Sequence, residues 1–230
     1  MSAHADHGVI PSGVDEQSAA LLRRAYALAS PDDGQRLYTD WAETYDATML
    51  QGLGYVSPRL VAEALGRHVA ADHSAGDSAG QRPVLDIGCG TGLVGKEAAV
   101  LGFHCLDGLD LSAAMMSVAA GRGIYRHLLA ADLTQPLPIA DGEYAAVVSA
   151  GTFTSGHVDA SCLPELVRVL APGGCLVCTV HNAVWEPLGF AAGFAKLVAA
   201  GRLVSLEDSA VGYYETSSDD GRLLVFRRLP

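Results

Sequence analysis

Basic residues are scarce in this sequence. The 230 residues include 15 Lys and Arg against 26 Asp and Glu, which gives a formal net charge of −11. Proteins that bind nucleic acid usually present a basic face that neutralises phosphates. The deficit of positive charge therefore argues against a nucleic-acid partner.

Other absences from the sequence bear on where in the cell the protein is expected. No apolar run reaches the ~20 residues that a membrane-spanning helix needs. Residues 1–14 are polar, without the basic start and apolar centre of a signal peptide, and the five cysteines are scattered and odd in number. We therefore expect a cytoplasmic protein with no membrane partner. The sequence leaves open whether it is a monomer or a homodimer.

Two of the cysteines, Cys175 and Cys178, have the spacing of a redox or zinc pair. They lie in an apolar run that has the pattern of a buried strand. Because residues three apart on a strand point to opposite faces, we expect both to be core side chains. No other group of His, Cys, Asp and Glu has the spacing of metal ligands, so we expect no metal.

The pattern of elements predicts an α/β fold. Strands alternate with helices after residue 83, which indicates a largely parallel sheet covered by helices on both faces. A loop of low complexity, 71–82, precedes this part. The expected helices span 15–29, 36–49, 58–70, 93–101, 112–120, 163–170 and 188–200. The expected strands span 84–87, 103–109, 127–131, 144–150, 175–181, 211–215 and 223–228, the last two forming an antiparallel hairpin.

The turn after the first of these strands carries three alternating glycines. Asp86 is in the strand, and Gly88, Gly90 and Gly92 follow it before a helix. Glycines allow a tight turn and let a ligand lie against bare backbone. The turns of dehydrogenases place their last glycine three residues after the second, where this chain has Leu93. A carboxylate at this strand end would repel a pyrophosphate, but it suits the ammonium group of S-adenosylmethionine.

Acids also end the next two strands. Asp110 lies at about the spacing expected of an acid that accepts both ribose hydroxyls, although it could instead cap a helix. Asp132 could accept from the adenine amine between the apolar walls of Leu111 and Leu133, or it could be an ordinary turn aspartate. Ligands of such sheets bind at the carboxyl ends of the strands, so the three acids predict one site.

Together these residues resemble the class I S-adenosylmethionine-dependent methyltransferases. The glycine turn, Asp110, Asp132 and the Pro-Gly-Gly run at 172–174 match recurrent features of that family. A closer resemblance is to the methyltransferase-like group named for the Williams–Beuren region and its bacterial relatives, through segments 38–46, 53–55, 123–128 and 163–169. The resemblance covers residues 38–228 and leaves the acceptor undefined.

The resemblance implies a doubly wound, Rossmann-like sheet of seven mostly parallel strands, with an antiparallel terminal hairpin and N-terminal helices. It also implies S-adenosylmethionine as the cofactor. We expect a partly helical N-terminal extension over 1–35 and a methyltransferase domain over 36–230. The expected cofactor-binding residues are Tyr38, Trp41, Asp86, Gly88, Cys89, Gly90, Gly92, Asp110, Leu111, Met115, Asp132, Leu133, Ala150 and Gly151.

Catalysis of methyl transfer rests mainly on positioning, with a base needed only when the acceptor must lose a proton. His157 and His181 follow the fourth and fifth strands and are candidate bases, although either could be a surface or structural histidine. The fourth strand lacks the Asn/Asp-Pro-Pro-aromatic run of enzymes that methylate amino groups of DNA bases. We expect a small-molecule acceptor in a mostly apolar pocket formed by the N-terminal helices, the loop 151–161 and the segment from 182.

Two other functions fit parts of this sequence. A protein that binds S-adenosylmethionine or S-adenosylhomocysteine without turnover would need no base. A nicotinamide-dependent oxidoreductase would share the glycine-rich turn, but the glycine spacing disfavours it.

Overall fold

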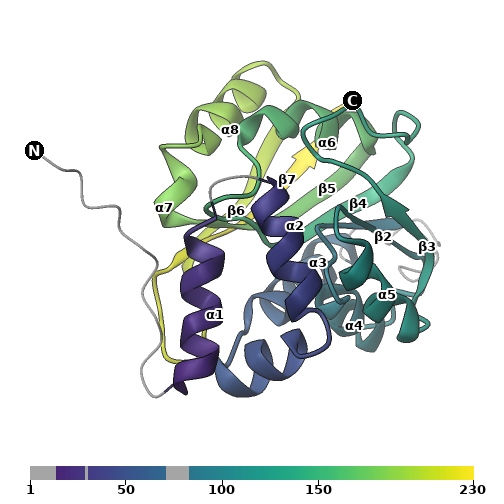
Figure 1. The fold of residues 1–230 in the computed structure, drawn as a ribbon. Coiled ribbons are helices and arrows are strands. Elements are labelled where there is room, and N and C mark those ends of the chain that lie inside the picture. The colour runs from purple at the N-terminus through teal and green to yellow at the C-terminus, as the bar shows by residue number, and fades with distance from the viewer. Residues whose placement is uncertain (1–13, 29–30, 71–82) are drawn as a thin grey trace, which may run out of the picture.

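The computed structural model describes residues 14–28, 31–70 and 83–230. Seven strands form one sheet in the order β3-β2-β1-β4-β5-β7-β6 (Figure 1). Strands β1 to β5 are parallel, and β7 pairs antiparallel with both β5 and β6. The strands are β1 (Val84–Ile87), β2 (Leu106–Asp110), β3 (Tyr125–Ala130), β4 (Tyr144–Phe153), β5 (Leu170–His181), β6 (Leu203–Val211) and β7 (Gly221–Arg228). This confirms the predicted fold class.

Helices cover both faces of the sheet. Side chains of α3 and α4 pack on one face, and those of α6 and α8 pack on the other, while α1 and α2 lie side by side (Figure 1). The helices are α1 (Glu16–Tyr26), α2 (Pro31–Trp41), α3 (Ser57–Ala70), α4 (Leu93–Val100), α5 (Ala113–Gly121), α6 (Leu163–Val169), α7 (Asn182–Trp185) and α8 (Phe190–Ala199). Two shorter elements are the π-helix η1 (Ala47–Gly52) and the 3₁₀ helix η4 (Ala160–Cys162). The predicted domain boundary after residue 35 falls inside α2, and a separate N-terminal extension stays a prediction.

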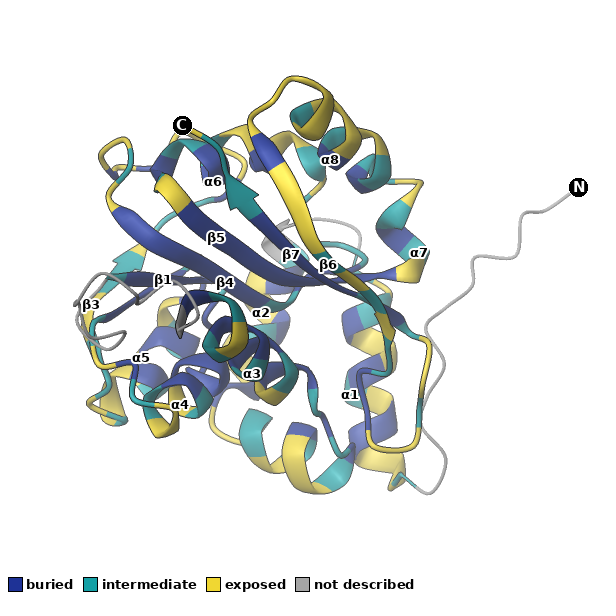
Figure 2. Ribbon diagram, turned by 180° about the vertical axis from the view of Figure 1, so that it is seen from behind, coloured by how far each residue is buried: buried dark blue, intermediate teal, exposed yellow. Residues whose placement is uncertain are grey.

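The central strands are buried on both faces, as Figure 2 shows for β4, β5 and β7. Cys175 packs in the cluster beneath α3 and α4, and Cys178 packs in the cluster beneath α6 and α8. Both thiols are buried and free. The prediction that they are core side chains on opposite faces is confirmed, because alternation along β5 separates them.

Two elements differ from the predictions. The sixth strand is Leu203–Val211 and not 211–215. It lies at the sheet edge with most residues exposed (Figure 2), so its sequence lacks the apolar run of a buried strand. The helix expected over 36–49 is divided, since α2 ends at Trp41 and η1 begins at Ala47. The helix expected over 188–200 is confirmed as α8, with the one-turn α7 before it. The predicted loop 71–82 lies outside the described residues.

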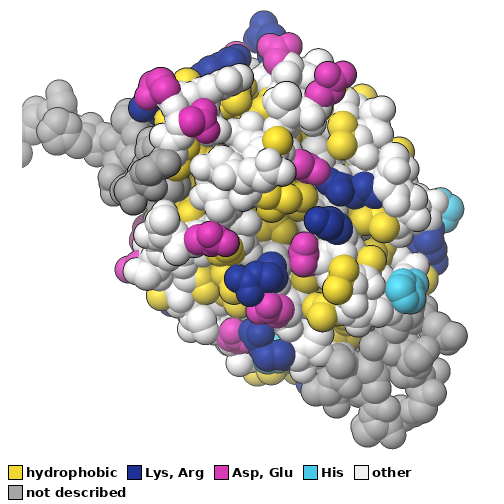
Figure 3. All heavy atoms as spheres, turned by 90° about the horizontal axis from the view of Figure 1, so that it is seen from below, with side chains coloured by type: hydrophobic (Ala, Val, Ile, Leu, Met, Phe, Trp, Pro, Cys, Tyr) yellow, Lys and Arg dark blue, Asp and Glu magenta, His cyan; other side chains and the backbone are white. Residues whose placement is uncertain are grey.

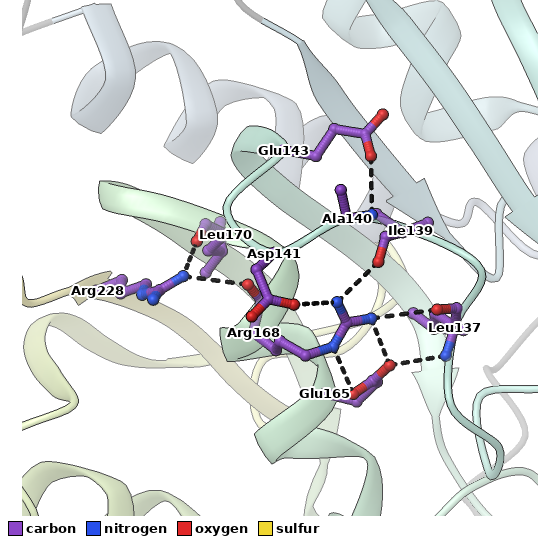
Figure 4. A network of polar contacts seen from close by, with 9 residues as sticks. All are labelled: Leu137, Ile139, Ala140, Asp141, Glu143, Glu165, Arg168, Leu170 and Arg228. Atoms are coloured by element: carbon purple, nitrogen blue, oxygen red, sulfur yellow. Dashed lines mark hydrogen bonds and ion pairs between the residues drawn. The ribbon is translucent and has the colours of Figure 1, made fainter.

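A network around Arg168 fixes the loop that leads into β4 (Figure 4). The guanidinium donates to the carbonyl of Ile139 at 2.7 Å and to Asp141 at 2.6 Å. Glu165 accepts from Arg168 and from the backbone N–H of Leu137. The charged residues of segment 163–169 therefore have a structural role. Their network lies near the start of β4, at the end of the strand that is farther from the glycine turn.

No helix within the described ranges is long and apolar enough to cross a membrane.

Candidate functional site

The glycine turn joins β1 to α4 at the point where the strand order reverses. Gly88 has a φ of 60° and Gly90 a φ of 53°, values that favour glycine. A Cβ at Gly88 would lie 2.1 Å from Thr152 Oγ1, whereas a Cβ at Gly90 would have no heavy atom closer than 3.8 Å. Both glycines line a cavity at the carboxyl ends of the strands, which we call the cofactor cavity. A ligand can therefore contact bare backbone at Gly90.

Asp110 lies beside this turn at the end of β2. Its Oδ2 accepts from the Gly90 N–H at 2.7 Å, and its Oδ1 accepts from the Ser112 N–H at 2.7 Å. Burial raises the pKa of Asp110, and the two backbone N–H groups oppose that rise. Each oxygen of a carboxylate can accept a second hydrogen bond. Asp110 lines the cofactor cavity, so it can hold the turn and accept a pair of ribose hydroxyls. Ser112, and not Asp110, caps the following helix.

Asp132 follows β3 and lines the same cavity. Its Oδ1 accepts from the N–H and the hydroxyl of Thr134, each at 2.8 Å. Asp132 is thus a turn aspartate, as the alternative interpretation holds, and it also faces the space where an adenine would bind. Leu111 and Leu133 line the cavity as the expected apolar walls.

Asp86 does not line the cavity. It is fully buried beneath the turn, where its Oδ2 accepts from Tyr125 at 2.6 Å and from the Gly95 N–H at 3.2 Å. Its Oδ1 has no hydrogen-bond partner. Burial raises the pKa of Asp86 to about 7. Because Asp86 has no exposed surface, it supports the turn from behind, and a ligand in the cavity would meet the backbone of the turn in front of it.

Aromatic residues close the cavity from above. Tyr38 and Tyr45 line it, whereas Trp41 lies behind them with 2% of its surface exposed. The Tyr38 and Trp41 rings stack at 6.0 Å, and Tyr45 meets Trp41 edge-on at 4.8 Å. Trp41, which the sequence predicts to lie over the cofactor, does not line this cavity and instead supports Tyr38 by stacking on its ring.

His157 also lines the cofactor cavity. Its Nδ1 lies 3.0 Å from the carbonyl oxygen of Ser155, and its Nε2 lies 3.0 Å from the Tyr38 hydroxyl. Because a carbonyl only accepts, we assign the ring proton to Nδ1, which leaves the Nε2 lone pair to accept from Tyr38. Burial lowers the pKa of His157, so the neutral form is favoured. The geometry suits a general base.

His181, the second candidate base, does not line the described cavities. Its Nδ1 accepts from the Ala183 N–H at 3.1 Å and so caps α7. The ring packs against Tyr26 and Tyr213. This histidine is structural, and the prediction that it faces the acceptor is corrected.

The remaining predicted residues divide into two groups. Met115, Ala150 and Gly151 line the cofactor cavity. Cys89 is buried against Gly108, and Gly92 precedes α4 as its N-cap, so both shape the turn from behind. The sequence did not single out several further lining residues, which are Gly34, Gln35, Ser112, Thr134, Gly156 and Val158.

A polar cluster that the sequence did not reveal ties the aromatic segment to the glycine turn. Asp46 accepts from the Thr91 hydroxyl at 2.5 Å and pairs with Arg122. The Arg122 Nε donates to the Thr91 carbonyl at 2.6 Å. The only signal in the sequence is the position of Asp46 directly after Tyr45. The cluster therefore holds Tyr45, the neighbour of Asp46, in place relative to the glycine turn.

A second cavity, which we call the aromatic chamber, adjoins the first. Tyr38, Tyr45, Gly151 and His157 line both. The other lining residues of the chamber are Leu22, Ala25, Tyr26, Trp41, Met49, Tyr55, Thr154, Tyr213 and Tyr214. The N-terminal helices and the loop after β4, which the sequence predicts to form the acceptor pocket, thus both line this chamber.

The segment from residue 182 does not contribute to the chamber. Phe190 and Phe194 are buried in the core cluster beneath α8, so their apolar character reflects packing. Tyr213 and Tyr214, which follow β6, take the place that the prediction gave to this segment. In the described part of the chain, no group of three or more His, Cys, Asp and Glu could hold a metal ion.

Comparisons with known proteins agree with this site. The methyltransferase domain family matches residues 84–174. The chain is 39% identical to methyltransferase-like protein 27 of Homo sapiens over 69% of its own length and 62% of that protein. It is 41% identical to the 18S rRNA (guanine-N(7))-methyltransferase RID2 of Arabidopsis thaliana over 30% of its length and 23% of that protein. The chain therefore matches less than two thirds of either relative.

Solved structures share the fold. Magnesium protoporphyrin IX methyltransferase of Synechocystis PCC 6803, solved with bound S-adenosylmethionine, superposes with a TM-score of 0.55 at 16% identity. The superposition covers 94% of this chain and 99% of that one. Strand order, glycine turn and these matches agree, and the chain belongs to the class I S-adenosylmethionine-dependent methyltransferases.

Proposed function

We propose that this protein transfers the methyl group of S-adenosylmethionine to a small-molecule acceptor by in-line displacement. The observation that carries the proposal is the shared wall of Tyr38, Tyr45, Gly151 and His157 between the cofactor cavity and the aromatic chamber. An acceptor in the chamber would lie next to a cofactor in the adjoining cavity. Such proximity aligns two reactants, which is the main requirement of methyl transfer.

Different residues of the cofactor cavity would bind different parts of S-adenosylmethionine. Asp110 would accept the ribose hydroxyls, and Leu111 and Leu133 would enclose the adenine near Asp132. The bound cofactor supplies an electrophilic methyl group on a cationic sulfonium. The faces of Tyr38 and Tyr45 would stabilise that positive charge.

His157 would act as the general base for an acceptor that must lose a proton. Its Nε2 accepts from the Tyr38 hydroxyl where the two cavities meet, and its Nδ1–H donates to the Ser155 carbonyl. This arrangement fixes the tautomer that accepts a proton at Nε2. The lowered pKa keeps the base form available at neutral pH.

A small molecule suits the site better than RNA does. The net charge is −11, and the described face in Figure 3 shows acidic and basic side chains interspersed. The chamber is bounded by α1 and by Tyr213 and Tyr214, which leaves a confined space. The five cysteines, all free, support a cytoplasmic location for this activity.

Two measurements test the proposal. Calorimetry should detect binding of S-adenosylmethionine and S-adenosylhomocysteine to the protein, but no binding of NAD. Incubation with methyl-labelled cofactor and a cell extract should move label into the small-molecule fraction. Label found mainly in RNA or protein would refute the acceptor class. Binding without label transfer to any fraction would favour the non-catalytic binding protein.

A further inference from the structure

We infer that the acceptor is an uncharged, flat aromatic molecule that carries the hydroxyl group to be methylated, and that it binds in the aromatic chamber. The inference rests on the proposed function and adds the chemical class of the acceptor. The chamber lies against Tyr38 and His157, so a ring inside it would present its hydroxyl to the wall shared with the cofactor cavity.

The lining of the chamber excludes a charged occupant. No Lys, Arg, Asp or Glu is among its described lining residues, and burial keeps His157 neutral by lowering its pKa. A charged ligand would lose its hydration there without gaining an ion-pair partner. Aromatic faces attract cations, but a cationic acceptor would lie beside the cationic sulfonium and be repelled by it.

The shape of the lining favours a flat ring. Tyr55 packs edge-on against Tyr213, with ring centroids 6.5 Å apart, and tilted against Tyr214, with ring centroids 5.9 Å apart. The stacked pair of Tyr38 and Trp41 forms another side. Ring faces and edges at such distances are the geometry in which aromatic groups pack favourably. The tyrosine hydroxyls of the chamber add polar groups that can bind oxygen atoms of an acceptor.

Trp41 supplies an independent observation. Its side chain lines the chamber and is almost fully buried, yet its indole N–H has no hydrogen-bond partner. Buried donors are rarely left unpaired, because their desolvation costs about 1–3 kcal/mol. The nitrogen itself has almost no exposed surface, so a carbonyl or ether oxygen on the acceptor would pair with this donor once the indole turns toward the chamber. The chamber therefore fits a ring that bears an oxygen acceptor as well as the reacting hydroxyl.

The reaction that follows from this placement is balanced. The hydroxyl oxygen attacks the methyl carbon, the new O–C bond forms, and the S–C bond breaks with its electron pair left on sulfur. His157 Nε2 takes the hydroxyl proton in place of its hydrogen bond from Tyr38, and the proton later passes to water. The products are an aryl methyl ether and S-adenosylhomocysteine.

Trp41 also provides a direct readout, because the chain contains 2 tryptophans. Trp185 packs against Phe194 and Arg222, away from the chamber. In Trp185→Phe, all tryptophan fluorescence comes from Trp41. With S-adenosylhomocysteine saturating at pH 6.5, titration with 4-hydroxyacetophenone should change this fluorescence. The matched phenols 4-hydroxybenzoate, an anion, and tyramine, a cation, should bind at least tenfold more weakly.

A second variant tests the indole donor. Trp41→Phe keeps an aromatic ring and removes the N–H, so calorimetry should show 4-hydroxyacetophenone binding about 3- to 10-fold more weakly, whereas the control Trp185→Phe should bind it as the parent protein does. With S-adenosylmethionine, the parent protein should yield 4-methoxyacetophenone by mass spectrometry. Equal or tighter binding of either charged phenol, or no response to any phenol, would overturn the inference while cofactor binding upholds the proposed function. Failure to bind S-adenosylhomocysteine would refute the proposed function itself.

Discussion

Replacing Asp86 with Asn should change how the stability of the cofactor-free protein depends on pH. The carboxyl is fully buried, and burial raises its pKa from 3.8 to about 7. The folded chain therefore holds a proton between these values that the unfolded chain has already released. Stability falls as pH rises in that range and is level above pH 7, because ionised Asp86 destabilises the fold.

The magnitude follows from the shift. Each pKa unit corresponds to about 1.36 kcal/mol, so Asp86 alone should lower the unfolding free energy by about 3 kcal/mol between pH 5 and pH 8. The amide that Asp86→Asn introduces does not titrate, so the free-energy cost of burying it is nearly the same at pH 5 and at pH 8. The difference in unfolding free energy between wild type and Asp86→Asn should therefore change by about 3 kcal/mol in favour of the variant, or roughly 6–12 °C in melting temperature.

Urea denaturation of both proteins at pH 5 and pH 8 measures this difference. Asp107→Asn is the matched control, because Asp107 is also buried but accepts from Arg126 at 2.7 Å and from Tyr144 at 2.9 Å. Removing that carboxylate leaves a guanidinium without its partner, so the control should destabilise the fold at both pH values. Parallel pH profiles for wild type and Asp86→Asn would refute the assignment of a raised pKa to Asp86.

Three further predictions concern binding and turnover. Asp110→Ala should weaken S-adenosylhomocysteine binding by about 1–3 kcal/mol, or roughly 5- to 150-fold, in calorimetry, whereas Asp208→Ala in a surface ion pair should leave it unchanged; equal affinities would reject the ribose assignment. Gly90→Ala should impair cofactor binding more than Gly102→Ala does, because both residues have positive φ but only Gly90 lines the cavity. Equal losses of affinity in the two variants would show that backbone strain, and not contact with the cofactor, explains the effect at Gly90. The pH profile of kcat/KM should show an acid limb with a midpoint below 6.5, since burial lowers the pKa of His157, and an unchanged limb in His157→Ala would exclude this base.

Local patterns in the sequence predicted the frame of the site. The glycine turn, the strand before it and the helix after it occur where expected, because alternating glycines and a short apolar run are local signals. Asp110 and Asp132 both line the cofactor cavity, since the ends of parallel strands meet at one edge of the sheet. The number of strands followed from the family resemblance, and the antiparallel hairpin followed from the short turn-rich loop between the last two expected strands.

Side-chain direction was beyond the sequence. Asp86 and Trp41 were expected to face the cofactor, but both are buried and neither lines the cofactor cavity. His181 was expected at the acceptor and instead caps α7. Residue type and spacing indicate which elements approach a site, whereas packing decides which atoms reach it.

The sequence by itself determined the fold class, the glycine turn and the kind of ligand that an acid-led turn can hold. Only the tertiary structure decided the aromatic chamber, because its walls come from segments far apart in the chain. Tyr55 and Tyr214 meet through an isolated β-bridge, and the hydroxyl of Tyr26 lies 3.2 Å from that of Tyr214. Such contacts depend on how α1, η1 and the end of β6 pack together, which no local pattern specifies.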